Sequence, residues 1–361
     1  MTVAEGGAAG RMLPVMGRLL HRDPPIVFGP NLGHDQLAPA SRIAPLLGDR
    51  PAWTLIVVHW SLEVAAHRRA LVADWQAFAR AYPRHKLLVL CNTEAERALL
   101  AAEGVRSAHC NHNMLVDERV FDVMPGRAVE FDAVYNARLE PYKRHHLARD
   151  VARLALIYSE FERSAPDYVA AVRAALPQAV FVNEAIAHST YARPAHARAA
   201  ALINRVLATR RYTTLTQQTV VDAYNSAATG LCLSEVEGAM YASMEYLLAG
   251  LPVVTTPSIG GRDHFFHPDY ALSVAPDPAA VRDGVAAMIR RAIPRAQIRA
   301  AVLDRVRAER LRFLDVLHGI FVEAGAEGGF EAAVAGLFVG RPWTWQDRRD
   351  LAGLTPEGAA R

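Results

Sequence analysis

Short runs of apolar and β-branched residues alternate with helical patterns along most of this 361-residue chain, and this alternation constrains the fold more than any other feature. A helix between two strands returns the chain to the same edge, so the strands lie parallel and helices cover both faces of the sheet. The sequence therefore predicts an α/β protein. In such sheets, ligands bind beyond the carboxyl ends of the strands.

The length predicts two domains, at roughly 100 to 200 residues each. We expect a mobile arm at 1–24, a first domain at 25–125, a second domain at 126–294, and C-terminal helices at 295–361 that can pack back on the first domain. The predicted strands are 26–28, 53–59, 86–91, 131–138, 155–158, 179–183, 230–234, 252–256 and 271–274. The predicted helices are 63–82, 166–176, 195–210, 215–227, 238–249 and 278–292.

Composition excludes several classes of protein. Hydrophobic residues make up 52% of the chain and charged residues 21%, which is typical of a globular protein, and the net charge of +3 gives no reason to expect nucleic acid as a partner. Cys91, Cys110 and Cys232 have no CxxC spacing, so neither zinc nor a disulfide framework is predicted. No signal peptide or membrane span is predicted. We expect a cytoplasmic protein, and peripheral contact with the inner membrane face stays open.

Two glutamates, Glu237 and Glu245, follow Ser234 in a largely apolar segment. If a helix begins at 235–238, they lie about 12 Å apart along its axis and about 80° apart around it. The N–H groups of 238–241 would then favour an anion or a polyhydroxylated ligand, and such a pair suits a sugar nucleotide. Alternatively, Ser234 and Glu237 form a capping box that only starts the helix, and Glu245 faces solvent.

Two cations follow the first strand of the second domain. Arg138 closes the strand, and Lys143 follows five residues later, past a proline that bends the loop. Both can converge at the carboxyl edge of the sheet, where Arg and Lys together suit a diphosphate. The alternative is a solvated basic turn that includes the basic residues at 144–146.

The motifs R-L-x-x-x-K, S-x-x-E-G-x6-E and A-G-x-P-V-V occur in this order, and the segments SIGGRDHFF and YALSVAPDPAAVRDGVAAMI follow. Over residues 131–292 the chain resembles the donor domain of the retaining GT-B glycosyltransferases of family 4 (glycosyl transferases group 1). The resemblance implies a GT-B fold, with two Rossmann-like domains and a cleft between them. The first domain would hold the acceptor, and the second would bind the donor.

The resemblance also implies roles for individual residues. Arg138 and Lys143 would bind the donor diphosphate, Glu237 would contact the transferred sugar, and Glu245 would bond the ribose hydroxyls. The backbone of four further residues would approach the sugar and the phosphates: Gly238, Ala239, Met240 and Tyr241.

The chain departs from the family pattern in several places. Ala137 stands where glycine is common, and Ala239-Met240 replaces Gly-Phe, which leaves the donor sugar open. The N-terminal half is short and lacks the Gly-rich first loop. Its segment WTLIVVHWS resembles a strand that ends in a sugar-facing histidine, so His59 is a candidate contact, although a histidine at a strand end is more often structural.

The other histidines are not predicted to bind metal. The segment HCNHN at 109–113 lacks a positioned third or fourth ligand, and we expect it in the interdomain linker. We expect His145, His146, His264 and His267 at the surface or in loops.

We therefore predict a metal-independent transferase that moves a hexosyl or related sugar from a nucleoside diphosphate sugar to a glycan, lipid-linked or small-molecule acceptor, with retention of configuration. No cofactor beyond the donor is expected. Two alternatives stay open: a GT-B sugar-nucleotide epimerase, and a non-catalytic GT-B partner protein, which the shortened N-terminal half favours. The absence of a GxGxxG after a strand argues against a Rossmann dehydrogenase. The base, the sugar, the acceptor and the oligomeric state are not predicted.

Overall fold

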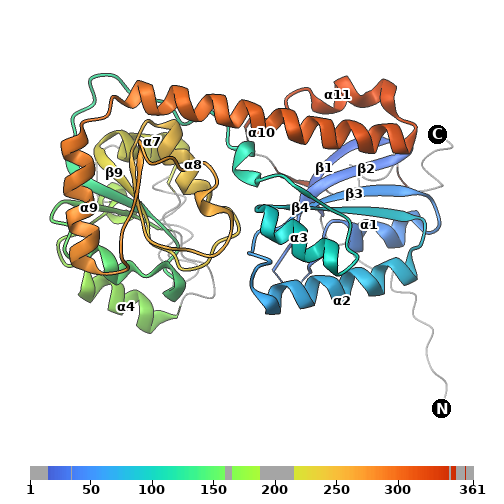
Figure 1. The fold of residues 1–361 in the computed structure, drawn as a ribbon, viewed down its shortest axis with the longest axis horizontal. Coiled ribbons are helices and arrows are strands. Elements are labelled where there is room, and N and C mark those ends of the chain that lie inside the picture. The colour runs from blue at the N-terminus through green and yellow to red at the C-terminus, as the bar shows by residue number, and fades with distance from the viewer. Residues whose placement is uncertain are drawn as a thin grey trace, which may run out of the picture. The chain divides into compact units, whose positions relative to one another are not determined.

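The computed structural model of the protein describes residues 15–33, 35–158, 165–187, 215–340, 343–346 and 354 (Figure 1). The chain divides into two compact units. Unit 2 is Val116–Glu309, and unit 1 comprises the residues up to Leu115 and those from Arg310 on. Each unit is built on one six-stranded sheet. The helix predicted at 195–210 lies outside the described residues.

The sheet of unit 2 has the strand order β11-β10-β9-β6-β7-β8, and all neighbouring strands are parallel. Counted along the chain, this is the 3-2-1-4-5-6 order of Rossmann-like sheets, which reverses between β6 and β9. Ligands bind beyond the carboxyl ends of the strands at this reversal. The strands are β6 (Phe131–Asn136), β7 (Leu154–Ile157), β8 (Val180–Phe181), β9 (Ala227–Cys232), β10 (Val253–Thr255) and β11 (Ala271–Ser273).

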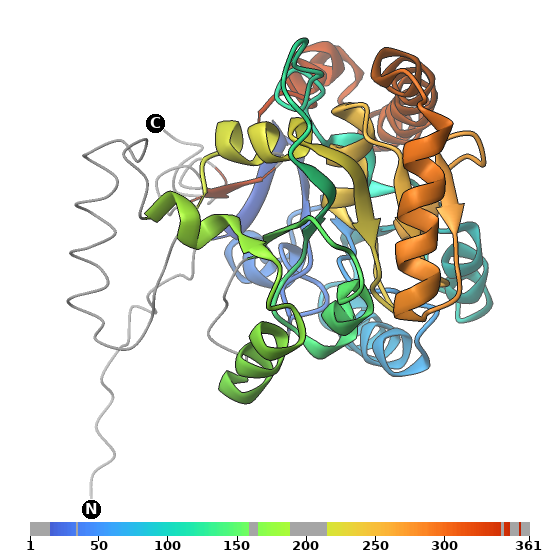
Figure 2. The same cartoon turned by 90° about the vertical axis from the view of Figure 1, so that its left-hand side faces the viewer.

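Helices cover both faces of this sheet. A Cβ on Gly284 of α9 would lie 3.1 Å from Val254, and a Cβ on Gly230 would lie 2.5 Å from the Tyr246 ring of α8. Gly230 pairs with Val253, so its side-chain direction is opposite to that of Val254, and α8 and α9 lie on opposite faces. Figure 2 shows α9 beside the strands. The helices are α4 (Pro166–Ala175), α5 (Val182–Ala187), α7 (Gln217–Asn225), α8 (Tyr241–Leu248) and α9 (Pro278–Arg291).

The close packing of Gly230 against Tyr246 yields a stability prediction. Gly230→Ala is expected to lower the free energy of unfolding of unit 2 by about 1–3 kcal/mol, because the added methyl group overpacks a fully buried ring. The Tyr246 ring cannot easily move away, since its hydroxyl accepts a 2.6 Å hydrogen bond from the Asn136 N–H. Urea denaturation measures the change. Unchanged stability would show that α8 can shift away from β9.

The sheet of unit 1 has the strand order β12-β1-β2-β3-β4-β5. β2 to β5 are parallel and follow one another in chain order, whereas β1 and β12 are antiparallel additions. Figure 1 shows the second half of α10 and the helix α2 on opposite sides of these strands. The strands are β1 (Val15–Arg22), β2 (Pro25–Pro30), β3 (Ala52–Val57), β4 (His85–Cys91), β5 (Ser107–His109) and β12 (Thr344–Gln346). The helices are α1 (Ala40–Leu47), α2 (Ala65–Ala81), α3 (Glu94–Ala102), α10 (Arg295–Ala324), whose first half belongs to unit 2, and α11 (Phe330–Val334).

Two predictions that concern strands were wrong. We expected residues 1–24 to form a mobile arm, but Val15–Arg22 form β1, and Val15 is buried in a core cluster with Val27 and Ile43. The strand predicted at 179–183 ends at Phe181, and α5 begins at the next residue.

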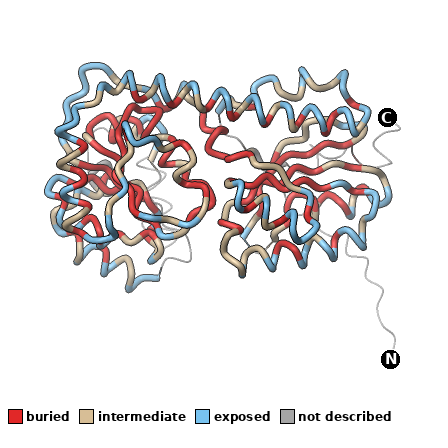
Figure 3. The backbone as a smooth tube through the Cα atoms, in the orientation of Figure 1, coloured by how far each residue is buried: buried red, intermediate tan, exposed pale blue. Residues whose placement is uncertain are grey.

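The central strands are buried along most of their length in both units, as Figure 3 shows. In β3, for example, Thr54–Val57 are all at most 3% exposed. Strands covered on both faces appear as continuous apolar runs, which is why most of them were visible in the sequence. Among the described residues, none of the helices combines the length and the hydrophobicity needed to cross a membrane.

Candidate active site

The first part of the site is the loop after β6, at the point where the strand order reverses. Asn136 ends β6, and the exposed Arg138 follows two residues later. The short helix η2 (Pro141–Lys143) then turns the Lys143 side chain into the interior, where it is 7% exposed. The hydroxyl of the buried Tyr135 donates to the Lys143 carbonyl and fixes this turn.

The second part is the loop between β9 and α8, which carries Glu237. α8 begins at Tyr241, so the predicted helix start at 235–238 is wrong, and the axial spacing calculated from it does not apply. The capping-box alternative is wrong as well, because the Glu237 N–H donates to the Ile259 carbonyl at 3.0 Å. A β-bridge between Val236 and Ile259 holds the loop extended, and this pairing with the loop after β10 prevents the helix from starting earlier.

The side chains of Lys143 and Glu237 form a buried ion pair. Lys143 Nζ donates to Glu237 Oε1, and the Glu237 side chain is only 10% exposed. The Lys143 ammonium also lies 5.1 Å from the centre of the Tyr142 ring. Each charge of a buried pair depends on the other for compensation. The structure thus brings together two residues that came from separate sequence motifs, and the solvated-turn alternative does not hold for Lys143.

Arg138 lies within electrostatic range of the same tyrosine. Burial and the charge of Glu237 raise the pKa of the Tyr142 hydroxyl, and the charge of Arg138 opposes that rise. Arg138 is exposed, whereas Lys143 is buried. The two cations therefore flank the carboxyl end of β6 in different environments, one facing solvent and one facing the interior.

Glu245 lies in the second turn of α8, where it is half-buried. The Tyr224 hydroxyl donates to Glu245 Oε2 at 2.6 Å and accepts from Asn136 Nδ2, also at 2.6 Å. Burial raises the pKa of the Glu245 carboxyl to about 7, and the hydrogen bond from Tyr224 opposes that rise. Glu245 is thus tied to the end of β6 rather than facing solvent freely. Tyr224 was not predicted as a site residue.

Four residues link Glu237 to α8. Ala239 and Met240 are buried, Gly238 accepts a hydrogen bond from the Gly261 N–H at 2.6 Å, and Tyr241 begins the helix. A helix N-terminus carries a partial positive charge. A cation, an acid and this helix end therefore meet where the strand order reverses, and this combination can hold an anion beside hydroxyl groups.

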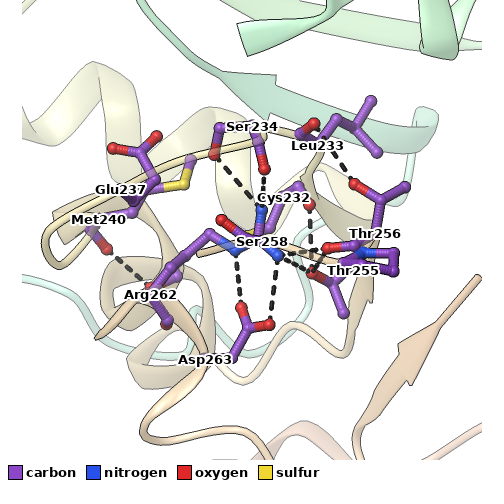
Figure 4. Close-up of polar contacts among 12 residues, drawn as sticks. Cys232, Leu233, Ser234, Glu237, Met240, Thr255, Thr256, Ser258, Arg262 and Asp263 are labelled. Carbon is purple, nitrogen blue, oxygen red and sulfur yellow. Dashed lines mark hydrogen bonds and ion pairs between the residues drawn. The ribbon is translucent and has the colours of Figure 1, made fainter. Parts of the chain in front are cut away.

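Two further arginines contact the same loops, and neither was predicted as a site residue. Figure 4 shows Arg262, which is completely buried and donates to Ser234, Thr255 and Thr256. Arg144 donates to the Leu233 carbonyl at 2.6 Å. Arg144 belonged to the solvated-turn alternative, but it bonds to the loop after β9.

The histidines near the basic turn differ from one another. His145 was expected at the surface or in a loop; it lies in the loop after β6 but is completely buried, with Nδ1 3.1 Å from the Tyr168 hydroxyl. Burial, together with the charge of Lys143, lowers the pKa of His145 to about 3, so it stays neutral. His146 and His267 are exposed, as expected. His264 is half-buried and bonded to Glu309 at 3.2 Å.

His59 belongs to unit 1, two residues beyond the end of β3. Its N–H donates to Asn31 Oδ1 at 3.0 Å, and its ring centre lies 5.5 Å from that of His112. The segment at 109–113, expected in the interdomain linker, lies just before the division between the units at Leu115, and its Asn111 and His112 are buried and bonded to Asn92. The contact of His59 with a sugar stays a prediction. So does the expectation that residues 109–113 bind no metal.

No protein-family model and no curated protein sequence matches the chain. Solved structures do match its fold. HepE from Anabaena in complex with UDP is 16% identical, with 77% of this chain and 74% of that chain covered and a TM-score of 0.51. HepE with UDP and glucose is also 16% identical, with 76% and 73% covered and a TM-score of 0.51. Sucrose-phosphate synthase from Thermosynechococcus elongatus is 14% identical, with 75% and 68% covered and a TM-score of 0.48.

These neighbours are GT-B glycosyltransferases. The chain has the GT-B fold. In this GT-B protein, unit 2 is a Rossmann-like sheet with the complete 3-2-1-4-5-6 order. Unit 1 has four parallel strands in chain order, and its described strands contain no such reversal. Unit 2 therefore contains the strand-order reversal beyond which ligands bind in sheets of this kind.

Proposed function

We propose that the chain is a glycosyltransferase that moves a sugar from a nucleoside diphosphate sugar to an acceptor. The observation that carries the proposal is the buried pair of Lys143 and Glu237, which joins the loops after β6 and β9 at the reversal of a Rossmann-like sheet. A cation and an acid placed there match the two ends of a sugar diphosphate. The fold alone would not support this function, because one fold serves many reactions.

Lys143, Arg138 and the N-terminus of α8 are assigned to the diphosphate. When the bond between the sugar C1 and the β-phosphate oxygen breaks, negative charge develops on that phosphate. Lys143 supplies a point charge close to it, and the exposed Arg138 can fork onto phosphate oxygens. Charges that are already in place when the bond breaks lower the barrier without reorganisation. We therefore propose that transfer needs no metal ion.

Glu237 and Glu245 are assigned to the hydroxyl groups at the two ends of the donor. Glu237 would accept hydrogen bonds from the transferred sugar and orient it, and Glu245 would accept from the ribose. The backbone from Gly238 to Tyr241 would lie along the sugar and the phosphates. Retention of configuration and transfer of a hexose belong to the same proposal and rest on the resemblance to family 4.

A donor screen tests the proposal. Thermal-shift assays with UDP-, GDP-, ADP- and dTDP-sugars are expected to show one class that raises the melting temperature, because ligands that bind the folded state stabilise it. UDP-glucose is the first donor to test, since the HepE complexes contain UDP and glucose. Absence of a shift with every donor would contradict donor binding.

After the donor screen, turnover is measured with a panel of acceptors. Formation of a glycosylated acceptor, unchanged by EDTA, is the expected result. Conversion of the donor to other products without an acceptor would indicate an epimerase, and binding without any turnover would indicate a non-catalytic protein. A strict requirement for a divalent cation would contradict the proposed use of Lys143 and Arg138.

Donor affinity is expected to rise with pH through about 7, because burial raises the pKa of Glu245 to about 7. Only the ionised carboxylate accepts hydrogen bonds from ribose hydroxyls with both oxygens. Its ionised fraction rises from roughly a tenth at pH 6 to nine tenths at pH 8, so the Kd for UDP-glucose should fall roughly tenfold. Calorimetry at several pH values measures this change, and UDP-glucose itself does not titrate in the range.

Glu245→Gln is the control for this pH dependence. Its affinity should be weaker at pH 8 and independent of pH. Folding stability supplies a second readout: the native state keeps a proton that the unfolded state loses between pH 4.5 and about 7, so wild-type stability relative to the variant should fall as pH rises through that range. A pH-independent Kd in the wild type would contradict the ribose assignment.

A further inference from the structure

A completely buried arginine lies beside the loop that carries Glu237, and the proposed chemistry does not use it. Arg262 is 0% exposed and belongs to the short helix η4 (Gly261–Asp263), in the loop after β10. Its Nη1 donates to the Ser234 carbonyl at 2.7 Å, and Figure 4 shows that residue at the start of the Glu237 loop. Its Nη2 donates to Thr255 Oγ1 at 2.6 Å, at the end of β10.

All the N–H groups of the Arg262 guanidinium form hydrogen bonds within the protein. Besides these bonds, Nη1 reaches Ser234 Oγ at 3.3 Å, and Nη2 reaches the Thr256 carbonyl at 2.5 Å. Nε donates to Asp263 Oδ1 at 2.6 Å, and this acid is 40% exposed. A guanidinium has five N–H donors, and these bonds occupy them. Arg262 therefore joins protein segments and has no N–H group left to bond a ligand.

The two loops that Arg262 joins are also paired along their backbones. The N–H of Glu237 donates to the Ile259 carbonyl at 3.0 Å, and the Ile259 N–H donates to the Glu235 carbonyl at 2.9 Å. On the other side of Glu237, the Gly261 N–H donates to the Gly238 carbonyl at 2.6 Å. The segment that bears Glu237 is thus held before and after the acid by the segment that bears Arg262.

Arg144 holds the same loops from the side of β6. Its Nε donates to the Leu233 carbonyl at 2.6 Å, and its Nη2 donates to Thr256 Oγ1 at 2.8 Å. The loops after β6, β9 and β10 are therefore linked by two arginines. Lys143 is the residue directly before Arg144, so these links bear on both members of the Lys143–Glu237 pair.

We propose that Arg262 is a positioning residue for Glu237: it fixes the loop after β9 to the loop after β10, so that the Glu237 carboxylate stays in place when the donor takes Lys143 as its partner. The proposal rests on the glycosyl transfer proposed above. Arg262 acts through the loop and does not touch the donor. Misplacement of a reacting group by about 1 Å can cost ~100-fold in rate, so the loss of these bonds should appear in kcat.

Arg262→Lys tests the proposal, because lysine keeps the charge but cannot bridge both loops. We expect kcat to fall at least about 30-fold while the donor KM changes less than about threefold. Arg295→Lys is the matched control. Arg295 is half-buried in the same unit and donates to the carbonyls of Ala227 and Ala249, away from the carboxyl edge. The Arg295→Lys variant should keep kcat within about twofold.

A double variant separates positioning from general damage. In a Glu237→Gln background, adding Arg262→Lys should lower kcat less than about threefold, because residues that act through one another are not additive. Equal losses in the two backgrounds, or an equal loss of kcat in Arg295→Lys, would overturn the proposal. Should Arg262→Lys fail to fold, Arg144→Lys loosens the same loop and is expected to lower kcat at a constant KM.

Hydrogen exchange supplies a readout that does not depend on turnover. In Arg262→Lys, the amides of residues 234–241 should exchange at least about tenfold faster, and in Arg295→Lys they should be unchanged. Unchanged exchange in Arg262→Lys would overturn the positioning role even if the wild type proved inactive. An inactive wild type with faster exchange in this variant would instead overturn the proposed function and leave the positioning role standing.

Discussion

Replacing Lys143 by methionine is expected to lower kcat by about 10²–10³-fold, the usual cost of removing one preorganised group that stabilises charge in a transition state. Lys143 is 7% exposed, so its charge acts in an environment with little water, where electrostatic interactions are stronger than at the surface. Methionine keeps most of the apolar stem and removes the ammonium. Steady-state kinetics with the donor from the screen measure the effect.

Lys86→Met is the control for this variant, because Lys86 is exposed on β4 of unit 1. Its kcat should stay within about twofold of the wild type. Circular dichroism and hydrogen exchange should show that Lys143→Met is folded under the assay conditions. Near-normal turnover of a folded Lys143→Met would contradict the assignment of this lysine to the diphosphate.

Replacing Glu237 by leucine is expected to destabilise unit 2 by about 3–5 kcal/mol, because it leaves the Lys143 ammonium buried without a counter-charge. The double variant Lys143→Met with Glu237→Leu should recover most of that loss, because an apolar pair of similar volume can replace a buried ion pair at little cost. Urea denaturation of the two single variants and of the double variant closes a double-mutant cycle.

Glu235 provides the matched control in the same loop. Its side chain is exposed, so Glu235→Leu should change the free energy of unfolding by less than about 0.5 kcal/mol. A loss in Glu237→Leu as small as this would show that Lys143 finds water or another partner. The double variant should be stable but inactive, so stability and activity would separate in a single protein.

The positions of most strands could be predicted because buried parallel strands are continuous apolar runs. β4 shows this, with five consecutive buried residues from Leu87 to Cys91. β1 was missed because the segment VMGRLLHR contains glycine, arginine and histidine, and most of its residues are only half-buried. A half-buried antiparallel strand gives a weaker pattern than a parallel strand that is buried on both faces.

The start of α8 could not be predicted from local sequence. Ser234 and Glu237 match the capping-box spacing, but the loop that contains them pairs with Ile259, more than twenty residues further along the chain. Tertiary pairing overrides a local preference of this kind, because a capping box contributes only about 1 kcal/mol.

Some of the site residues could be predicted from the sequence, and others could not. Lys143, Glu237 and Glu245 were predicted because they belong to motifs of short spacing. Tyr224 and Arg262 were not, since their partners lie 21 and 28 residues away and no local pattern connects them. Their importance follows from side-chain contacts that only a folded structure shows.

The cancellation of charge between Lys143 and Glu237 bears on which molecules can enter the site. Inorganic phosphate or a bare nucleotide could attract the ammonium, but it would strand the carboxylate with nothing to bond to it. Only a ligand that carries an anionic group for Lys143 and hydroxyl groups for Glu237 would replace the bonds that both residues lose when their ion pair opens. We therefore expect this ion pair to bind simple phosphates more weakly than a molecule in which phosphate and sugar are joined.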